Sequence, residues 1–250
     1  MQTSINVIIL AAGNGTRMAS NGIPKVLHHV AGKPIILHVL NLAQLINPAQ
    51  IICVTNPAGG VIRNTIDEQN IVQKLIHAIQ ILPQGTGDGV KCALPHIDNS
   101  GISIILYGDH PLISQGTIDK LITKLSIHDE YGALVVGFHK SSPNQYGRLI
   151  LEGEELKAII EYSDASEEER KITLCNSGII AINNKYIHNF IAKIDNHNHK
   201  NEYYLTDIIK IANKENIKCS YITGDELELV GVNTQEELAQ AEEIFRQRLF

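Results

Sequence analysis

The chain has 250 residues, of which 44% are hydrophobic and 19% charged, which is enough for a substantial core in one large globular domain or two small ones. Its formal net charge of -6 argues against a general attraction to nucleic acid or to an anionic membrane, so an anion would need a local binding site. The amino-terminal apolar run is far too short to span a bilayer and follows no basic segment, so we expect a cytoplasmic protein. Four cysteines lie far apart with no C-x-x-C pair, which predicts buried thiols rather than disulfides or a zinc site: Cys53, Cys92, Cys175 and Cys219.

Short apolar runs in the first half, each ending near Gly, Asn or Asp, predict strands that are buried on both faces, as parallel strands are. These runs are 6–12, 50–56, 102–108 and 133–138. Amphipathic stretches at 33–45 and 115–125 predict helices between them. The alternation predicts an α/β fold with a doubly wound, Rossmann-like and mostly parallel sheet.

The second half is patterned differently. Within 146–162, apolar runs flank Gly-Glu-Glu, which predicts a hairpin, and 163–171 is so charged that it predicts a mobile loop. The run 176–182 predicts a further strand. We therefore expect a smaller β-rich lobe on the carboxyl side of the main sheet.

A helix is predicted at the end of the sequence. The four residues from Thr234 to Glu237 form a capping box, in which the first and last side chains bond to each other's main-chain N–H groups. Apolar residues then follow along one face: Leu238, Ala241, Phe245 and Leu249.

The first predicted strand leads into LAAGNGTRMASNGIPK, from Leu10 to Lys25. Ligands of open α/β sheets bind beyond the carboxyl ends of the strands. Gly13 and Gly15 would allow positive φ and remove Cβ atoms, so that main-chain N–H groups can face an anion. Arg17 and Lys25 would add charge-assisted hydrogen bonds, each contributing about 1.5–3 kcal/mol against about 1 for a neutral bond. The stretch predicts a triphosphate-binding loop, although the glycine spacing alone also fits a structural turn.

Two common phosphate-binding patterns do not match. The dinucleotide fingerprint G-x-G-x-x-G needs a third small residue where this chain has Met18, and a later run from Gly85 fails in the same way at Val90. The loop of ATPases, G-x-x-x-x-G-K-[ST], occurs nowhere. Both classes are therefore disfavoured.

A candidate metal ligand follows the third apolar run. In YGDHPL, Asp109 is placed at the carboxyl end of a probable central strand, where a carboxylate suits Mg²⁺. The alternative is a turn cap ahead of Pro111. Asn233 in VGVN is a second candidate oxygen ligand, with plain turn chemistry as its alternative.

These motifs carry a resemblance. LAAGNGTRM with PKVLH, YGDHPLI, YGRL, NSGI, EYYLTD and GVN occur in the order and approximate spacing of the bacterial N-acetylglucosamine-1-phosphate uridylyltransferases. The chain resembles this family over essentially its whole length. The resemblance implies a Mg²⁺-dependent nucleotidyltransferase that makes UDP-N-acetylglucosamine, a cell-wall precursor, and pyrophosphate from UTP and N-acetylglucosamine 1-phosphate. Many members continue into an acetyltransferase β-helix, whereas this sequence ends at Phe250.

The resemblance also implies roles for individual residues. Uracil, ribose and phosphates would be bound by Leu10, Ala11, Gly13, Gly15, Thr16, Arg17, Lys25, Gln80, Gly85 and Thr86. The sugar phosphate would be bound by Tyr107, Gly108, Gly147, Glu161, Asn176, Tyr204 and Thr206. Mg²⁺ would be held by Asp109 and Asn233, and the catalytic residues would be Arg17, Lys25 and Asp109. The single domain would divide into a nucleotide-binding part at about 1–138, a sugar-binding lobe at about 139–228, and a metal-ligand loop with the terminal helix at about 229–250.

Some positions depart from the family pattern. Asn14 stands where a lysine or another long polar residue is common, and Leu82-Pro83-Gln84 replaces the usual Glu-Gln-Leu before Gly85. The base is therefore less firmly indicated than the fold. A nucleotidyltransferase for another base or sugar, and a non-catalytic nucleotide-sugar binding module, are the alternative functions; the sequence does not indicate an oligomeric state.

Overall fold

The computed structural model describes residues 3–13, 15, 18, 22–141 and 144–248. Of the residues singled out above, Asn14, Thr16, Arg17 and Leu249 lie outside this described part.

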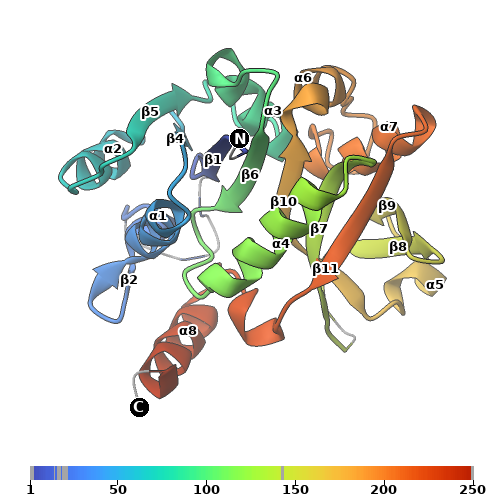
Figure 1. Ribbon diagram of the computed structural model, residues 1–250. Helices are drawn as coiled ribbons and strands as arrows, with labels where there is room; N and C mark the ends of the chain where they lie inside the picture. Colours follow the sequence, from blue (N-terminus) through green and yellow to red (C-terminus); the bar gives the residue numbers. More distant parts are fainter. Residues whose placement is uncertain (1–2, 14, 16–17, 19–21, 142–143, 249–250) are drawn as a thin grey trace.

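One large sheet organises the molecule (Figure 1). Its main strands are β1 (Ile5–Leu10), β4 (Gln50–Thr55), β5 (Lys74–Ile79), β6 (Ile102–Tyr107), β7 (Tyr131–His139), β10 (Leu174–Asn183) and β11 (Lys218–Thr223). They lie in the order β11-β7-β10-β6-β1-β4-β5. Neighbours pair in parallel except at β10, which runs antiparallel to both β6 and β7. The predicted mostly parallel α/β sheet is therefore confirmed.

Helices cover both faces of the sheet. The longer ones are α1 (Ile35–Leu45), α2 (Gly60–Asp67), α3 (Thr86–Ala93), α4 (Gln115–Ile127), α6 (Asn184–Ala192), α7 (Ile208–Lys214) and α8 (Gln235–Arg248). Because side chains alternate along a strand, Val7 and Ile9 of β1 join one core with α1, α2 and α4, whereas Ile8 joins a second core with α3, α6 and α7. This double covering is what the alternating pattern predicted. None of the described helices is long and apolar enough to cross a membrane.

The predicted hairpin is formed by β8 (Arg148–Glu152) and β9 (Glu155–Ile160). It joins the main sheet where β8 pairs with β10. The prediction of a mobile loop at 163–171 is wrong in part, because this segment contains the short helix α5 (Glu167–Arg170). Ser166 Oγ accepts a hydrogen bond from Glu169 N, and the Glu169 carboxylate accepts one from Ser166 N, so a second capping box starts a helix there.

The terminal helix α8 begins at the predicted capping box. Glu237 N donates to Thr234 Oγ1 at 3.2 Å, and Thr234 N donates to the Glu237 carboxylate at 3.0 Å. Ala241 and Ile244 of α8 are buried in a small third core together with Met18. This core ties the end of the chain to the loop after β1.

Short elements complete the chain. They are a two-stranded sheet of β2 (His29–Val30) and β3 (Lys33–Pro34), and 3-10 helices η2 (Lys25–Leu27), η3 (Leu94–His96), η4 (Leu205–Asp207) and η5 (Glu226–Glu228).

All four cysteines are free, and three are buried while Cys92 is half-buried. Burial raises the pKa of Cys53 and of Cys219 to about 12, so these thiols are unreactive.

Candidate active site

A cavity of about 360 Å³ opens at the carboxyl edge of the sheet. Every predicted nucleotide-binding residue in the described part, except Gly15, contributes to its wall: Leu10, Ala11, Gly13, Lys25, Gln80, Gly85 and Thr86. Tyr107 and Asp109 join them from the end of β6. These residues come from the ends of β1, β5 and β6 because parallel strands end at the same edge.

Gly15 has a role that the sequence did not reveal. Its φ is +58°, as expected, but a Cβ there would lie 2.6 Å from Lys25 Cβ. Only glycine therefore lets the Lys25 backbone lie against the loop. The expectation of a positive φ is wrong for Gly13, whose φ is not positive. A Cβ on Gly13 would meet nothing within 4 Å, so the backbone there borders the open cavity.

Lys25 brings together two residues that are far apart in the sequence. Its ammonium is paired with Asp109 Oδ2 and donates to Asn233 Oδ1 at 3.0 Å. Asp109 follows β6, and Asn233 precedes α8; Val232 N donates to the main-chain oxygen of Asp109 at 2.9 Å and so holds the two segments together. The arrangement places one cation between two oxygen ligands.

The charge state of Asp109 suits this arrangement. Burial opposes ionisation, but in the acid range where Asp109 titrates the positive charges of His110 and Lys25 more than offset it and hold the pKa of Asp109 below its ordinary value. The carboxylate is therefore ionised at neutral pH. Burial has the larger effect on His110 and lowers its pKa, which leaves the imidazole neutral.

These oxygens fit a divalent cation. The Lys25 ammonium already occupies a cation position between Asp109 Oδ2 and Asn233 Oδ1. Carboxylate and amide oxygens are hard ligands, and Mg²⁺ commonly takes one or two protein groups together with water and phosphate oxygens. The described residues contain no group of three or more His, Cys, Asp or Glu side chains that could hold a metal by themselves.

The loop before α3 is fastened to the segment before η4. Tyr203 N donates to Gln84 O and Gly87 N donates to Tyr203 O, both at 2.8 Å, and Leu205 N donates to Thr86 Oγ1 at 3.1 Å. Gly85 has a φ of +116°, and a Cβ there would lie 2.6 Å from Tyr203 O. Glycine is thus required for this close approach.

Gln80 is buried at the end of β5, and its amide nitrogen donates to Gly85 O at 3.0 Å and to Asp88 Oδ2 at 2.8 Å. In this structure that nitrogen holds the loop. The predicted base-reading residues are therefore gathered at one wall of the cavity, with part of their hydrogen-bonding capacity already used.

Several predicted sugar-binding residues lie together. Thr206 Oγ1 donates to Glu161 Oε1 at 2.9 Å, and a Cβ on Gly147 would lie 3.4 Å from the Glu161 carboxylate. Asn176 N donates to Gly147 O at 2.8 Å. Burial raises the pKa of Glu161, and the Thr206 hydrogen bond opposes that shift.

Tyr107 connects this group with the cavity. Its ring lines the cavity and packs against Gly178, where a Cβ would lie 2.7 Å away. Gly178, with a φ of +91°, lies at the irregularity of β10 just after Asn176. Burial and the nearby Glu161 charge raise the pKa of Tyr107, so its phenol is neutral. Gly108, also predicted, leaves room for Ile36, which would be 2.9 Å from its Cβ.

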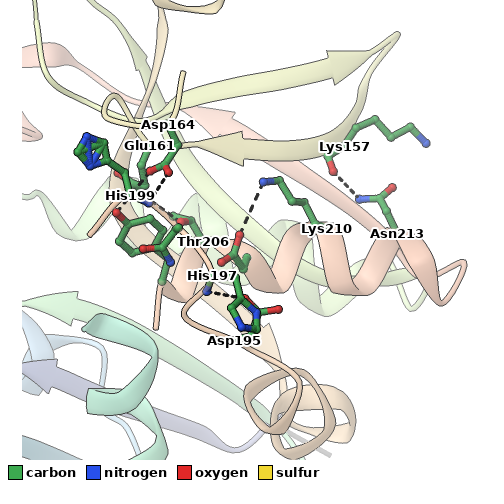
Figure 2. A network of polar contacts seen from close by, with 12 residues as sticks. Lys157, Glu161, Asp164, Asp195, His197, His199, Thr206, Lys210 and Asn213 are labelled. Atoms are coloured by element: carbon green, nitrogen blue, oxygen red, sulfur yellow. Dashed lines mark hydrogen bonds and ion pairs between the residues drawn. The ribbon is translucent and has the colours of Figure 1, made fainter. Parts of the chain in front are cut away.

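Tyr204 and Glu161 face a second cavity rather than the main one. The Tyr204 hydroxyl donates to Asp164 Oδ2 at 3.4 Å, and Asp164 also lines this second cavity of about 280 Å³. Figure 2 shows Glu161 and Asp164 close together there, with His199 N donating to Asp164 at 2.8 Å. The Tyr204 side chain thus bonds to the loop that carries Asp164.

Pro83, singled out in the sequence as a departure from the family pattern, lies in the cavity wall. Sequence reasoning missed Glu202 in the same wall, and two residues beside it: Asn56, whose amide donates to Ala12 O at 3.0 Å, and His110, which packs beside Asp109. Glu202 belongs to the quoted EYYLTD motif, which was the available signal.

A sheet that presents a lysine, a carboxylate and an amide oxygen beside an open cavity at its carboxyl edge is typical of an α/β nucleotide-binding protein. Residues 7–174 match the MobA-like NTP transferase domain, and the chain belongs to this family. It is 39% identical over 250 residues to the bifunctional protein GlmU of Paramagnetospirillum magneticum, covering 99% of this chain and 54% of that protein. It is 40% identical over 247 residues to the bifunctional protein GlmU of Nitrosospira multiformis, covering 98% of this chain and 52% of that protein.

These matches confirm the resemblance found in the motifs. The chain spans about half the length of the curated relatives it matches. The fold is similar to that of a Bacillus anthracis protein described as a glucose-1-phosphate thymidylyltransferase, crystallised with sucrose. The TM-score is 0.79 at 19% identity, and the match covers 97% of this chain and 96% of that one. At this identity the likeness supports the fold alone.

Proposed function

We propose that the protein transfers a uridylyl group from UTP to N-acetylglucosamine 1-phosphate, giving UDP-N-acetylglucosamine and pyrophosphate. The observation that carries the proposal is the convergence of Lys25, Asp109 and Asn233 at the mouth of the main cavity. The sequence similarity of the chain to the proteins named GlmU supports the choice of this reaction among nucleotidyl transfers. Because UTP is a cytoplasmic metabolite, the activity would place the protein in the cytoplasm.

The nucleotide would occupy the main cavity. Its base would face Gln80 and Gly85, and its phosphates would run along the backbone at Gly13 toward Lys25. Thr16 and Arg17, outside the described residues, would add donors to the same phosphates. Lys25 would then exchange its bond to Asp109 for one to the α-phosphate.

Asp109 and Asn233 would hold Mg²⁺ in the position that the Lys25 ammonium now takes. When bound, the ion would neutralise charge on the phosphate oxygens. The sugar would lie beside Glu161, Thr206 and Asn176, whose oxygens and amide can bond its hydroxyl and acetamido groups.

The chemistry needs few side chains. An oxygen of the sugar phosphate attacks the α-phosphorus, a new P–O bond forms, and the bond to the β-phosphate breaks so that pyrophosphate leaves with its electron pair. The attacking phosphate is already ionised at neutral pH, so no general base is required. The contribution of Lys25 and Arg17 is to orient the triphosphate and to spread the charge that develops in the transition state.

A matrix of nucleoside triphosphates against sugar 1-phosphates, with pyrophosphate release measured with and without Mg²⁺, tests the proposal. We expect turnover with UTP and N-acetylglucosamine 1-phosphate, and none without the metal. Preferred turnover of dTTP or CTP, or of another sugar, would identify a different nucleotidyltransferase. Calorimetric binding of UDP-N-acetylglucosamine without turnover of any pair would identify a binding module.

A further inference from the structure

His110 follows Asp109 directly, and its ring packs against the segment that carries Asn233. Its side chain is 9% exposed and meets the Tyr107 ring edge-on, with centroids 5.5 Å apart at 82°. On the other side it packs on Gly231, where a Cβ would lie 2.6 Å from His110 Nε2. The absence of a side chain at Gly231 therefore makes room for the imidazole.

Two buried polar atoms meet at this position. Asp109 Oδ1 and His110 Nδ1 are 3.5 Å apart, and within the described residues neither has a hydrogen-bond partner. That distance is too long for a sound hydrogen bond, and leaving two buried polar atoms unpaired is unfavourable. A hydrogen bond between them would satisfy both atoms.

The two oxygens of Asp109 thus face different groups. Oδ2 holds the Lys25 ammonium, and Oδ1 faces His110. A ligand that is hydrogen-bonded behind its metal-facing atom is fixed in orientation, and removal of such a partner commonly lowers metal affinity by about 10–100-fold.

We propose that His110 is a positioning residue whose Nδ1–H donates to Asp109 Oδ1 and so turns Oδ2 toward the cation position. An imidazole Nδ1 can carry a hydrogen and donate it to a carboxylate, and here it already lies 3.5 Å from Asp109 Oδ1. The inference rests on the proposed function in so far as that cation is catalytic. No other described side chain makes a hydrogen bond to this oxygen.

Asparagine and leucine form a matched pair of replacements at position 110. The asparagine Nδ2 and one leucine Cδ occupy nearly the place of the imidazole Nδ1, but only asparagine can donate. We therefore compare His110→Asn with His110→Leu by titrating Mn²⁺ alone and following free Mn²⁺ by electron paramagnetic resonance.

We expect His110→Leu to weaken Mn²⁺ binding by about tenfold, and His110→Asn to keep most of the wild-type affinity. With Mg²⁺ and substrates, His110→Leu should lower kcat while leaving the KM for the sugar phosphate unchanged. Equal Mn²⁺ affinity in the two variants, whether normal or reduced, would overturn the proposal, because the residue would then only fill space.

The outcomes separate this inference from the proposed function. If the wild type turns over no substrate pair but the two variants differ in Mn²⁺ affinity, the function is wrong and the positioning role holds. If turnover is normal and the variants do not differ, the positioning role is wrong.

A spectroscopic measurement covers the case in which His110→Leu does not fold. In protein with ¹⁵N-labelled histidine, His110 should show a protonated Nδ1 that exchanges slowly with water. The signal is assigned by its absence from His110→Asn, and its exchange should become fast in Asp109→Ala. A wild-type ring protonated at Nε2 instead would refute the hydrogen bond.

Discussion

Replacing Lys25 with methionine tests the cation position without altering either oxygen ligand. The side chains of Lys25 and Asp109 are each only 14% exposed, and the ammonium also donates to Asn233 Oδ1 at 3.0 Å. Removing one partner of a buried ion pair costs about 3–5 kcal/mol, because the other charge is left without compensation. With the remaining solvent access, we expect Lys25→Met to lower the free energy of unfolding by about 3 kcal/mol.

The loss should depend on the charge of Asp109. In Lys25→Met/Asp109→Asn no charge is left unpaired, so the double variant should be more stable than the sum of the single changes predicts, by about 2 kcal/mol. Mg²⁺ should also stabilise Lys25→Met more than the wild type, because the metal no longer competes with the ammonium for the two oxygens.

Urea unfolding followed by far-UV circular dichroism measures these differences, since the chain has no tryptophan for fluorescence. Lys120→Met, at an exposed position of α4, is the matched control and should have little effect. An unchanged stability of Lys25→Met, or additive effects in the double variant, would refute the assignment of Lys25 as the occupant of a metal position. Pyrophosphate release should be nearly lost in all variants that lack Lys25 or Asp109.

Three further predictions concern the sugar side and the loop before α3. Asn176→Ala should raise the KM for the sugar phosphate selectively in steady-state assays, and an effect on the KM for UTP alone would place the sugar elsewhere. Thr206→Val removes a hydrogen bond that favours the ionised form of Glu161, and so raises the pKa of Glu161 further. The acid-side fall of kcat/KM for the sugar phosphate should therefore move to higher pH, and an unchanged pH profile would contradict the role of this carboxylate. Gly85→Ala should lower the free energy of unfolding by about 2 kcal/mol and raise the KM for UTP, whereas Gly153→Ala, with positive φ but no atom within 4 Å of the new Cβ, should show only the smaller backbone effect.

Apart from the hairpin strands β8 and β9, the strands found from the sequence are those in the middle of the sheet. In β1 and β6, neighbours on both sides and helices on both faces require consecutive apolar residues, and this pattern is readable. The strands β5 and β11 end the sheet and keep half-exposed polar residues, so they gave no such run. The antiparallel insertion of β10 between β6 and β7 is a property of the topology that no local pattern encodes.

The position of a candidate site residue could be predicted where its type and its place at a strand end coincide, as for Asp109 after β6. The reason why position 15 needs glycine could not be predicted, because it depends on Lys25 approaching from another segment. The contact of Tyr203 with the Gly85 loop was missed for the same reason, and His110 is a lone histidine without a pattern around it. Long-range contacts, rather than composition, decide these roles.

The hydrogen bonds between the loop before α3 and the segment before η4 bear on how catalysis would be achieved. In-line attack depends on holding two separate substrates within a fraction of an ångström of the reactive geometry. Gly85, in the cavity wall, and Thr206, in the proposed sugar-binding group, belong to segments joined by three hydrogen bonds through Gln84, Gly87 and Thr86. These bonds would hold the two proposed binding regions in a fixed position relative to each other. The residue type at position 85 therefore affects the alignment of both substrates, although it touches at most one of them.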